Sequence, residues 1–125
     1  MNEKQKHNQS GEDYLESIYL LSKQLEFVHR IDIAKRMAVS GAAVNKAVNH
    51  LLKKGLVYED GKHLYLTIQG ESYAKEIYEK HCTLRDFLRS LGVSEENAEE
   101  DACKMEHLIS DETLSAIARA YNKRK

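Results

Sequence analysis

Apolar residues recur every three or four positions along most of the chain, which is the spacing of one buried helix face. Serine, threonine or aspartate, the residues that favour helix N-caps, precede the periodic segments, and glycines follow two of them. The pattern predicts six helices, which are expected over residues 10–24, 32–37, 42–54, 67–92 and 95–108, with a last helix after residue 110. Ser10, Asp32, Ser40, Thr67, Ser94 and Ser110 are the predicted starts.

Two short β-prone runs interrupt the helices at residues 56–59 and 62–66. Between them stands Asp60-Gly61, a strong signal for a two-residue hairpin turn. The order helix, short helix, tight turn, helix, hairpin is that of a winged helix-turn-helix. We therefore expect a mainly α (α+β) chain, with a winged helix-turn-helix over residues 1–72 and a helical region over residues 73–125.

The composition supports an ordered, helix-rich protein. The 125 residues are 42% hydrophobic and 31% charged, and they include no Pro and no Trp. This composition excludes a disordered chain, and no apolar run approaches the roughly 18 residues that span a bilayer. No secretory signal is evident at the N-terminus, so a cytoplasmic protein without membrane partners is expected, whose Cys82 and Cys103 are thiols.

Charge is segregated along the chain. Residues 28–63 carry seven Lys or Arg against three acids, whereas residues 76–112 carry eleven acids against four bases. This asymmetry suggests that one half meets a polyanion and the other holds cations. Two solvated faces that merely differ in charge would give the same pattern.

The third predicted helix carries the candidate DNA contacts. In a winged helix its N-terminal part reaches base edges, so Asn45 is expected to read adenine, Lys46 to donate to guanine, and the alanines to pack on thymine methyl groups. The wing and the end of the helix meet phosphates. The expected contacts are Ser40, Ala42, Ala43, Asn45, Lys46 and His50 to bases, and Lys53 and Lys62 to phosphates. A protein-interaction module with a basic surface is the alternative.

Metal-ligand residue types cluster in the second half. Cys103, Glu106 and His107 stand at i, i+3 and i+4, on one helix face. Asp13 and Glu16 form an i, i+3 pair on the first helix. Each residue has an ordinary alternative, since first-turn acids suit the helix dipole and a lone cysteine is often a small core residue. The metal hypothesis therefore depends on their convergence.

Five segments together resemble the diphtheria toxin repressor family of metal-dependent transcriptional regulators. The segments are residues 12–19 (EDYLESIY), 32–40 (DIAKRMAVS), 53–57 (KKGLV), 66–70 (LTIQG) and 102–111 (ACKMEHLISD). The resemblance covers about residues 10–112 and implies a homodimer that reads a palindromic double-stranded DNA operator when a divalent metal is bound. It further implies that the protein represses metal-uptake genes, that it is not an enzyme, and that it has no organic small-molecule substrate.

The resemblance also implies the metal ligands, which are Asp13, Glu16, His81, Cys103, Glu106 and His107. This set is mixed, because the Asp13 and Glu16 pair is similar to the manganese branch of the family and Cys103 to the iron branch. Mn(II) or Fe(II) is expected, with Co(II) or Zn(II) as alternatives. Thiolate is softer than carboxylate, so Cys103 should move the preference from Mn(II) toward Fe(II), Co(II) or Zn(II). Arg85 and Glu99 stand where the iron branch has further ligands, so its additional site is expected to be altered or absent. The size resembles the compact manganese regulators, without a third domain.

Three other functions remain open. A redox sensor would use Cys82 and Cys103, which lie 21 positions apart on different predicted helices. A metalloenzyme would need a general base outside the ligand set, and none is evident. A constitutive DNA-binding protein would use the metal only for structure.

Overall fold

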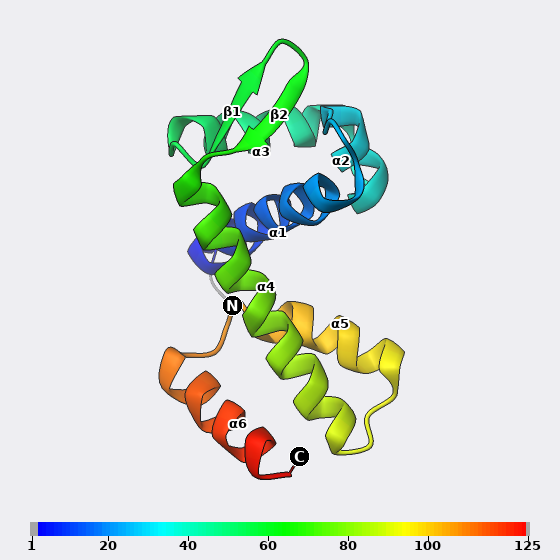
Figure 1. The fold of residues 1–125 in the computed structure, drawn as a ribbon, viewed down its shortest axis with the longest axis vertical. Helices are drawn as coiled ribbons and strands as arrows, with labels where there is room; N and C mark the ends of the chain where they lie inside the picture. Colours follow the sequence, from blue (N-terminus) through cyan, green and yellow to red (C-terminus); the bar gives the residue numbers. More distant parts are fainter. Residues whose placement is uncertain (1–2, 125) are drawn as a thin grey trace. The chain divides into compact units, whose positions relative to one another are not determined.

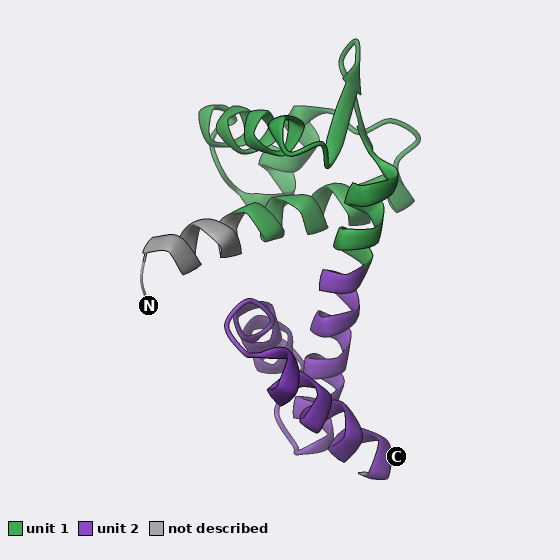
Figure 2. Ribbon diagram, turned by 90° about the vertical axis from the view of Figure 1, so that its left-hand side faces the viewer, with its two compact units in different colours: residues 1–75 green, residues 76–125 purple. Residues whose placement is uncertain are grey.

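The computed structural model describes the backbone of residues 3–124 and the side chains of residues 11–123. The chain forms two compact units, residues 1–75 and residues 76–125, which Figure 2 shows in green and purple. The first unit contains α1 (Glu3–Gln24), α2 (Arg30–Met37), α3 (Gly41–Lys53), β1 (Val57–Asp60) and β2 (His63–Leu66) (Figure 1). Helix α4 (Ile68–Ser90) begins there and ends in the second unit, which also contains α5 (Glu95–Met105) and α6 (Asp111–Arg124). The predicted mainly α (α+β) class is confirmed.

Three helices enclose the core of the first unit. Helix α1 packs against α2, α3 and β2. Its Leu15 and Ile18 are buried with Ile33 of α2 and with Val44 and Val48 of α3. The apolar stripe predicted for α3 is thus the buried face of that helix, and the opposite face carries polar side chains in solvent.

The turn between α2 and α3 is set by two residues. Ala38 ends α2 in the left-handed conformation, with φ of 56°. Ser40 caps α3, and its side chain accepts a hydrogen bond from the Ala43 N–H at 3.1 Å, so its predicted capping role is confirmed. The predicted cap of α2 is wrong: Asp32 lies inside the helix, where its carboxylate accepts from the His29 N–H at 2.8 Å. An acid at the third helical position can close a helix start from inside, as in a capping box.

The wing is an antiparallel hairpin in which Val57 pairs with Leu66 and Asp60 pairs with His63. Its two-residue turn is therefore Gly61-Lys62, one position later than predicted. Gly61 has φ of 63°, and a glycine with positive φ at the first turn position suits a II′ hairpin turn, so Asp60 is free to pair with His63.

Helix α4 begins against the end of α3. The Thr67 hydroxyl accepts from the Gly70 N–H at 3.0 Å and donates to the Gly55 carbonyl at 2.7 Å. At Gly70 the backbone of α4 touches the preceding segment, because a Cβ there would lie 1.8 Å from the Leu56 carbonyl oxygen. This contact admits only glycine without a backbone shift.

The second unit buries Ile77 and Leu84 of α4 with Ala98 and Ala102 of α5. Two predicted helix ends are wrong. Helix α5 ends at Met105 rather than at residue 108, and α1 begins at Glu3 rather than at residue 10, since residues 3–9 contain no Gly or Pro to stop the helix. No helix among the described residues has the length and apolar content needed to cross a bilayer.

Candidate functional site

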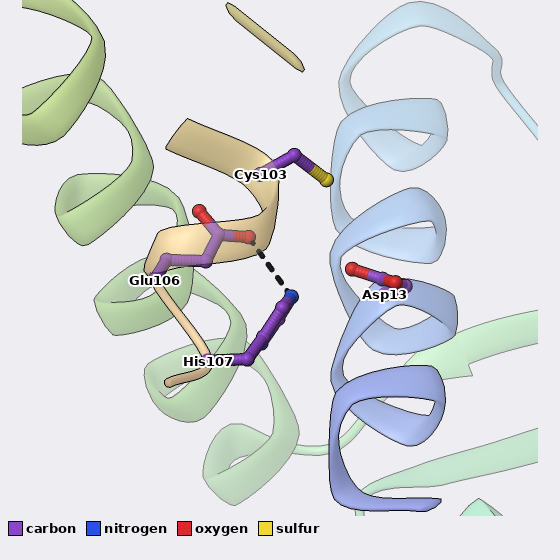
Figure 3. Close-up of side chains that lie close together, drawn as sticks. All are labelled: Asp13, Cys103, Glu106 and His107. Atoms are coloured by element: carbon purple, nitrogen blue, oxygen red, sulfur yellow. Dashed lines mark ion pairs between the residues drawn. The ribbon is translucent and has the colours of Figure 1, made fainter. Parts of the chain in front are cut away.

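The end of α5 gathers three metal-ligand side chains. Cys103 lies in the last turn, Glu106 is the C-cap and His107 follows directly. Each offers a ligand atom, and these atoms lie within 4.8 Å of one another. Figure 3 shows Cys103, Glu106 and His107 together, with the ion pair between Glu106 and His107 dashed. The three side chains converge as their spacing predicted, but Glu106 and His107 stand at and just beyond the end of α5 rather than on one face of the helix.

Glu106 is the buried centre of this group. Its side chain is 0% exposed, and its oxygens lie 3.2 Å from His107 Nε2 and 3.1 Å from His81 Nδ1. Despite these short distances, neither carboxylate oxygen nor His81 Nδ1 makes an aligned hydrogen bond with any described residue. Burial of a carboxylate costs several kcal/mol unless a charge or hydrogen bonds compensate it. An imidazole nitrogen and two carboxylate oxygens that meet in a buried place without hydrogen-bond alignment suit a cation.

His81 comes from α4 and is held from its other side. Its Nε2 lies 2.6 Å from Glu99 Oε1, and Arg85 Nη1 lies 3.7 Å from Glu99 Oε2. A carboxylate on the far nitrogen of a histidine orients the ring, as partners of metal-bound histidines commonly do. Sequence reasoning missed this role of Glu99, because 18 positions and a change of helix separate it from His81.

The environment of His81 favours its charged form. The Glu106 carboxylate beside Nδ1 raises the pKa of His81 to about 9, Glu99 adds to this effect, and burial opposes it. In the metal-free protein at neutral pH, His81 is therefore an imidazolium that neutralises the buried Glu106.

Asp13 and Glu16, the other two predicted ligands, lie on α1 in the first unit. Three positions separate them, so they share one face of that helix. Asp13 is half-buried and Glu16 is buried, with 8% exposure. Burial of two acids on one helix face is uncommon for residues that only solvate a surface.

The predicted DNA-contacting side chains lie on α3 and at the tip of the wing. Ala42, Asn45, Lys46, His50 and Lys53 are exposed on α3, whereas Ala43 is half-buried. Lys62 is exposed in the hairpin turn. Ser40 stands at the exposed N-terminus of α3, where its hydroxyl is engaged as the cap. The structure thus keeps these side chains, apart from Ala43, on the solvent side of the winged helix.

Sequence reasoning gave no role to Arg30, which is the centre of a polar network on this surface. Arg30 Nε and Nη2 donate to the two Glu59 oxygens at 3.0 and 2.7 Å. Its Nη1 donates to Asn45 Oδ1 at 3.0 Å, and Nη2 also donates to Asn49 Oδ1 at 3.5 Å. The network joins α2, α3 and β1. In the sequence, only the basic character of Arg30 pointed to this network, since its partner Glu59 stands 29 positions away.

A winged helix with a polar helix face, joined to a helical unit that buries imidazoles and a carboxylate together, defines a DNA-binding regulator with a metal site. The comparisons with known proteins agree. Residues 7–64 match the N-terminal DNA-binding domain of iron-dependent repressors. Residues 67–125 match their metal-binding and dimerisation domain. The chain belongs to the iron-dependent repressor family, whose members are metal-dependent transcriptional regulators and not enzymes, and the predicted family is confirmed.

Individual relatives show the same relationship. An uncharacterized HTH-type transcriptional regulator of Methanocaldococcus jannaschii is 40% identical over 113 residues, which are 88% of this chain and 90% of that protein. The transcriptional regulator MntR of Lysinibacillus sphaericus is 39% identical, over 87% of this chain and 79% of that protein. The solved structure of the manganese regulator SloR is 34% identical with a TM-score of 0.80, and it matches 90% of this chain. This chain spans about half of SloR, 53% of its length.

Proposed function

We propose that the chain is a homodimeric repressor that binds a palindromic operator when it holds a divalent metal. The proposed ligands are Asp13, Glu16, His81, Cys103, Glu106 and His107. The observation that carries this proposal is the Glu106 carboxylate, which is fully buried between two imidazoles without an aligned hydrogen bond. In the metal-free protein its charge is compensated by ion pairs alone, and a bound cation would take the place of the proton on His81.

The donor set suits a borderline transition metal. Carboxylate oxygens are typical ligands of Mn(II), imidazole nitrogen binds many first-row metals, and thiolate favours softer ions. Manganese is named for SloR, and Zn²⁺ is bound in a solved structure of ScaR. Mn(II) or Fe(II) is the proposed metal, and Co(II) and Zn(II) also fit the donors. When bound, the cation would compensate the carboxylates in place of the proton on His81.

The winged helix-turn-helix, residues 1–72, would supply DNA recognition, and the helical region, residues 73–125, would supply dimerisation. Lys53 and Lys62 would contact phosphates, and the exposed face of α3 would meet base edges in the major groove. On α6, half-buried side chains at helical spacing would contribute to the dimer interface; they are Leu114, Ile117, Ala118 and Tyr121. The predicted control of metal-uptake genes, and a place in the cytoplasm beside the DNA, belong to the same proposal.

The switch would follow from charge. Asp13 and Glu16 on α1 and Glu106 beside α5 carry like charges, so without a cation they repel one another. Held together as ligands, they would fix the spacing between the two recognition helices of a dimer at about one DNA turn, roughly 34–36 Å. A ~100-fold gain in operator affinity needs only about 2.7 kcal/mol of differential binding.

Fluorescence anisotropy with DNA from the gene's own upstream region tests the proposal. The metal-stripped protein is titrated in chelator, and then with Mn(II), at fixed salt. Tight binding is expected only with Mn(II), and it should be lost in Glu106→Gln. Glu100→Gln is the matched control, since Glu100 is an exposed acid of the same helix. Equal binding in chelator would contradict the proposal.

The assay also separates the alternatives left open by the sequence. A structural metal predicts that the chelator unfolds the protein, which circular dichroism detects. A redox sensor predicts that peroxide changes DNA affinity through Cys82 or Cys103, both half-buried and outside any disulfide. A dimer by light scattering is expected under all metal-loaded conditions, and a monomer would contradict the predicted assembly.

A further inference from the structure

Arg30 looks, from its charge and its place beside α3, like a phosphate-binding residue. Four of its five N–H donors nevertheless make hydrogen bonds within the protein. Glu59 takes Nε and Nη2 in a two-pronged ion pair, and two asparagines of α3 take further N–H groups. The pair is mutually stabilised, since the hydrogen bond from Arg30 lowers the pKa of Glu59. The positive charge of Arg30 is therefore compensated by Glu59 before any DNA arrives.

The chemistry of the guanidinium fixes the asparagine amides. Arginine has five N–H donors and no acceptor, so the atoms that it contacts on Asn45 and Asn49 must be the carbonyl oxygens. Each amide then presents its NH₂ group away from Arg30. The two side chains stand four positions apart on the exposed face of α3, where residues one turn apart are neighbours. The result is a pair of outward hydrogen-bond donors on the helix that would enter the groove.

Reading of adenine by asparagine requires both amide atoms, because the side chain accepts from N6 and donates to N7 of the base. The hydrogen bond from Arg30 occupies one lone pair of Asn45 Oδ1 and restricts the rotation of the amide. Guanine instead offers two adjacent acceptors, O6 and N7, and no donor on its major-groove edge. The NH₂ group is then the part of the Asn45 amide left to meet the groove, and such a donor matches guanine, as Lys46 does.

We propose that Arg30 is a positioning residue of the DNA-reading surface, which turns the Asn45 amide so that Asn45 specifies guanine rather than adenine. Glu59 acts in the same unit, because its carboxylate holds the guanidinium in place between α2 and β1. The inference rests on the proposed function, in that α3 must be the helix that reads the operator. It replaces the adenine contact expected for Asn45 from the residue type alone.

The competing role for Arg30 is an ordinary phosphate contact. Loss of such a contact weakens binding to all sequences alike and lowers the salt dependence of binding by about 0.9 per contact. Loss of a positioning residue instead relaxes the choice of base and leaves the salt dependence unchanged. The two roles therefore differ in what is measured and not only in how much affinity is lost.

The test is selection from a library of DNA duplexes whose central roughly 20 base pairs, two half-sites, are random. The Mn(II)-loaded full chain, Asn45→Ala, Arg30→Lys and Glu59→Ala are each used for selection, and thermal melts verify their folding. Asn45→Ala identifies the base pair that Asn45 reads. Arg36→Ala is the matched control, since it removes an exposed arginine of the same helix.

The wild type is expected to prefer G·C at the Asn45 position by at least about fivefold. Arg30→Lys and Glu59→Ala should both lose that preference, while the salt dependence of their binding stays at the wild-type value. Arg36→Ala should keep the preference. A preference for A·T at this position, or a preference that survives both variants, would overturn the inference while leaving metal-dependent DNA binding intact. If the wild type selects no sequence at all, the proposed function fails, and the inference fails with it.

Discussion

Metal binding should compete with a proton on His81, and the structure gives the size of the effect. With a pKa of about 9, the neutral fraction of His81 rises about 90-fold between pH 6 and pH 8. An ordinary histidine with a pKa near 6.5 would gain only about fourfold over the same range. Because a metal binds only the neutral imidazole, the apparent Mn(II) affinity should increase about tenfold per pH unit from this residue alone.

The assay is anaerobic competition of Mn(II) between the protein and a chelator of known pH dependence, at four pH values from 6 to 8. Other ligands also release protons, Cys103 among them, so the wild type is compared with His81→Asn, which keeps a neutral side chain at this position. Over each pH unit, the apparent Mn(II) affinity of the variant should increase by a factor about ten times smaller than that of the wild type. This difference isolates His81, since the other ligands are common to both proteins.

Parallel pH dependences in the two proteins would refute the reasoning. Either His81 would then not bind the metal, or Glu106 and Glu99 would not hold a proton on it. Direct observation of the His81 ring by NMR in the metal-free protein separates these outcomes, since it reports the protonation state without any metal.

Three further predictions concern the fold. Gly70→Ala should destabilise the protein by about 3 kcal/mol in urea unfolding, because its Cβ would strike the Leu56 carbonyl; Gly11→Ala, on an open face of α1, should cost nothing. Ala38→Gly should stabilise by about 1 kcal/mol, because it relieves a left-handed alanine, and lower stability would contradict this. In the metal-free protein, the raised pKa of His81 contributes stability that is complete below about pH 6.5 and is lost as the pH rises through about 9. The urea midpoint should therefore fall over that range, and a midpoint that rises would show the opposite sign.

The sequence was sufficient for the architecture because its signals are local. Ser40, Thr67, Ser94 and Ser110 mark helix starts that the structure confirms, since each hydroxyl accepts a hydrogen bond from the backbone N–H three residues later. The apolar stripe of α3 could likewise be predicted, because it depends only on the spacing of apolar residues within one helix. The start of α2 was misplaced, because Asp32 can serve a helix from outside as a cap or from inside as a first-turn acid.

The polar networks were beyond local reasoning. Arg30 and Glu59 meet only because the hairpin brings β1 to α2, and His81 and Glu99 meet only because α4 and α5 pack. The convergence of Cys103, Glu106 and His107 at the end of α5 could be predicted, since the three residues lie within five positions of the chain. The assignment of all six ligands came from the family resemblance and stays a prediction.

The most direct test of the central claim is the reciprocity of metal and DNA binding. If metal raises operator affinity by a given factor, the operator must raise metal affinity by the same factor. Mn(II) affinity should therefore be measured with and without saturating operator DNA, and operator affinity with and without Mn(II), at one salt concentration. The account predicts equal factors of about 100, which correspond to about 2.7 kcal/mol. A Mn(II) affinity that is the same with and without DNA would contradict it, because the metal would then be a structural ion and not a signal.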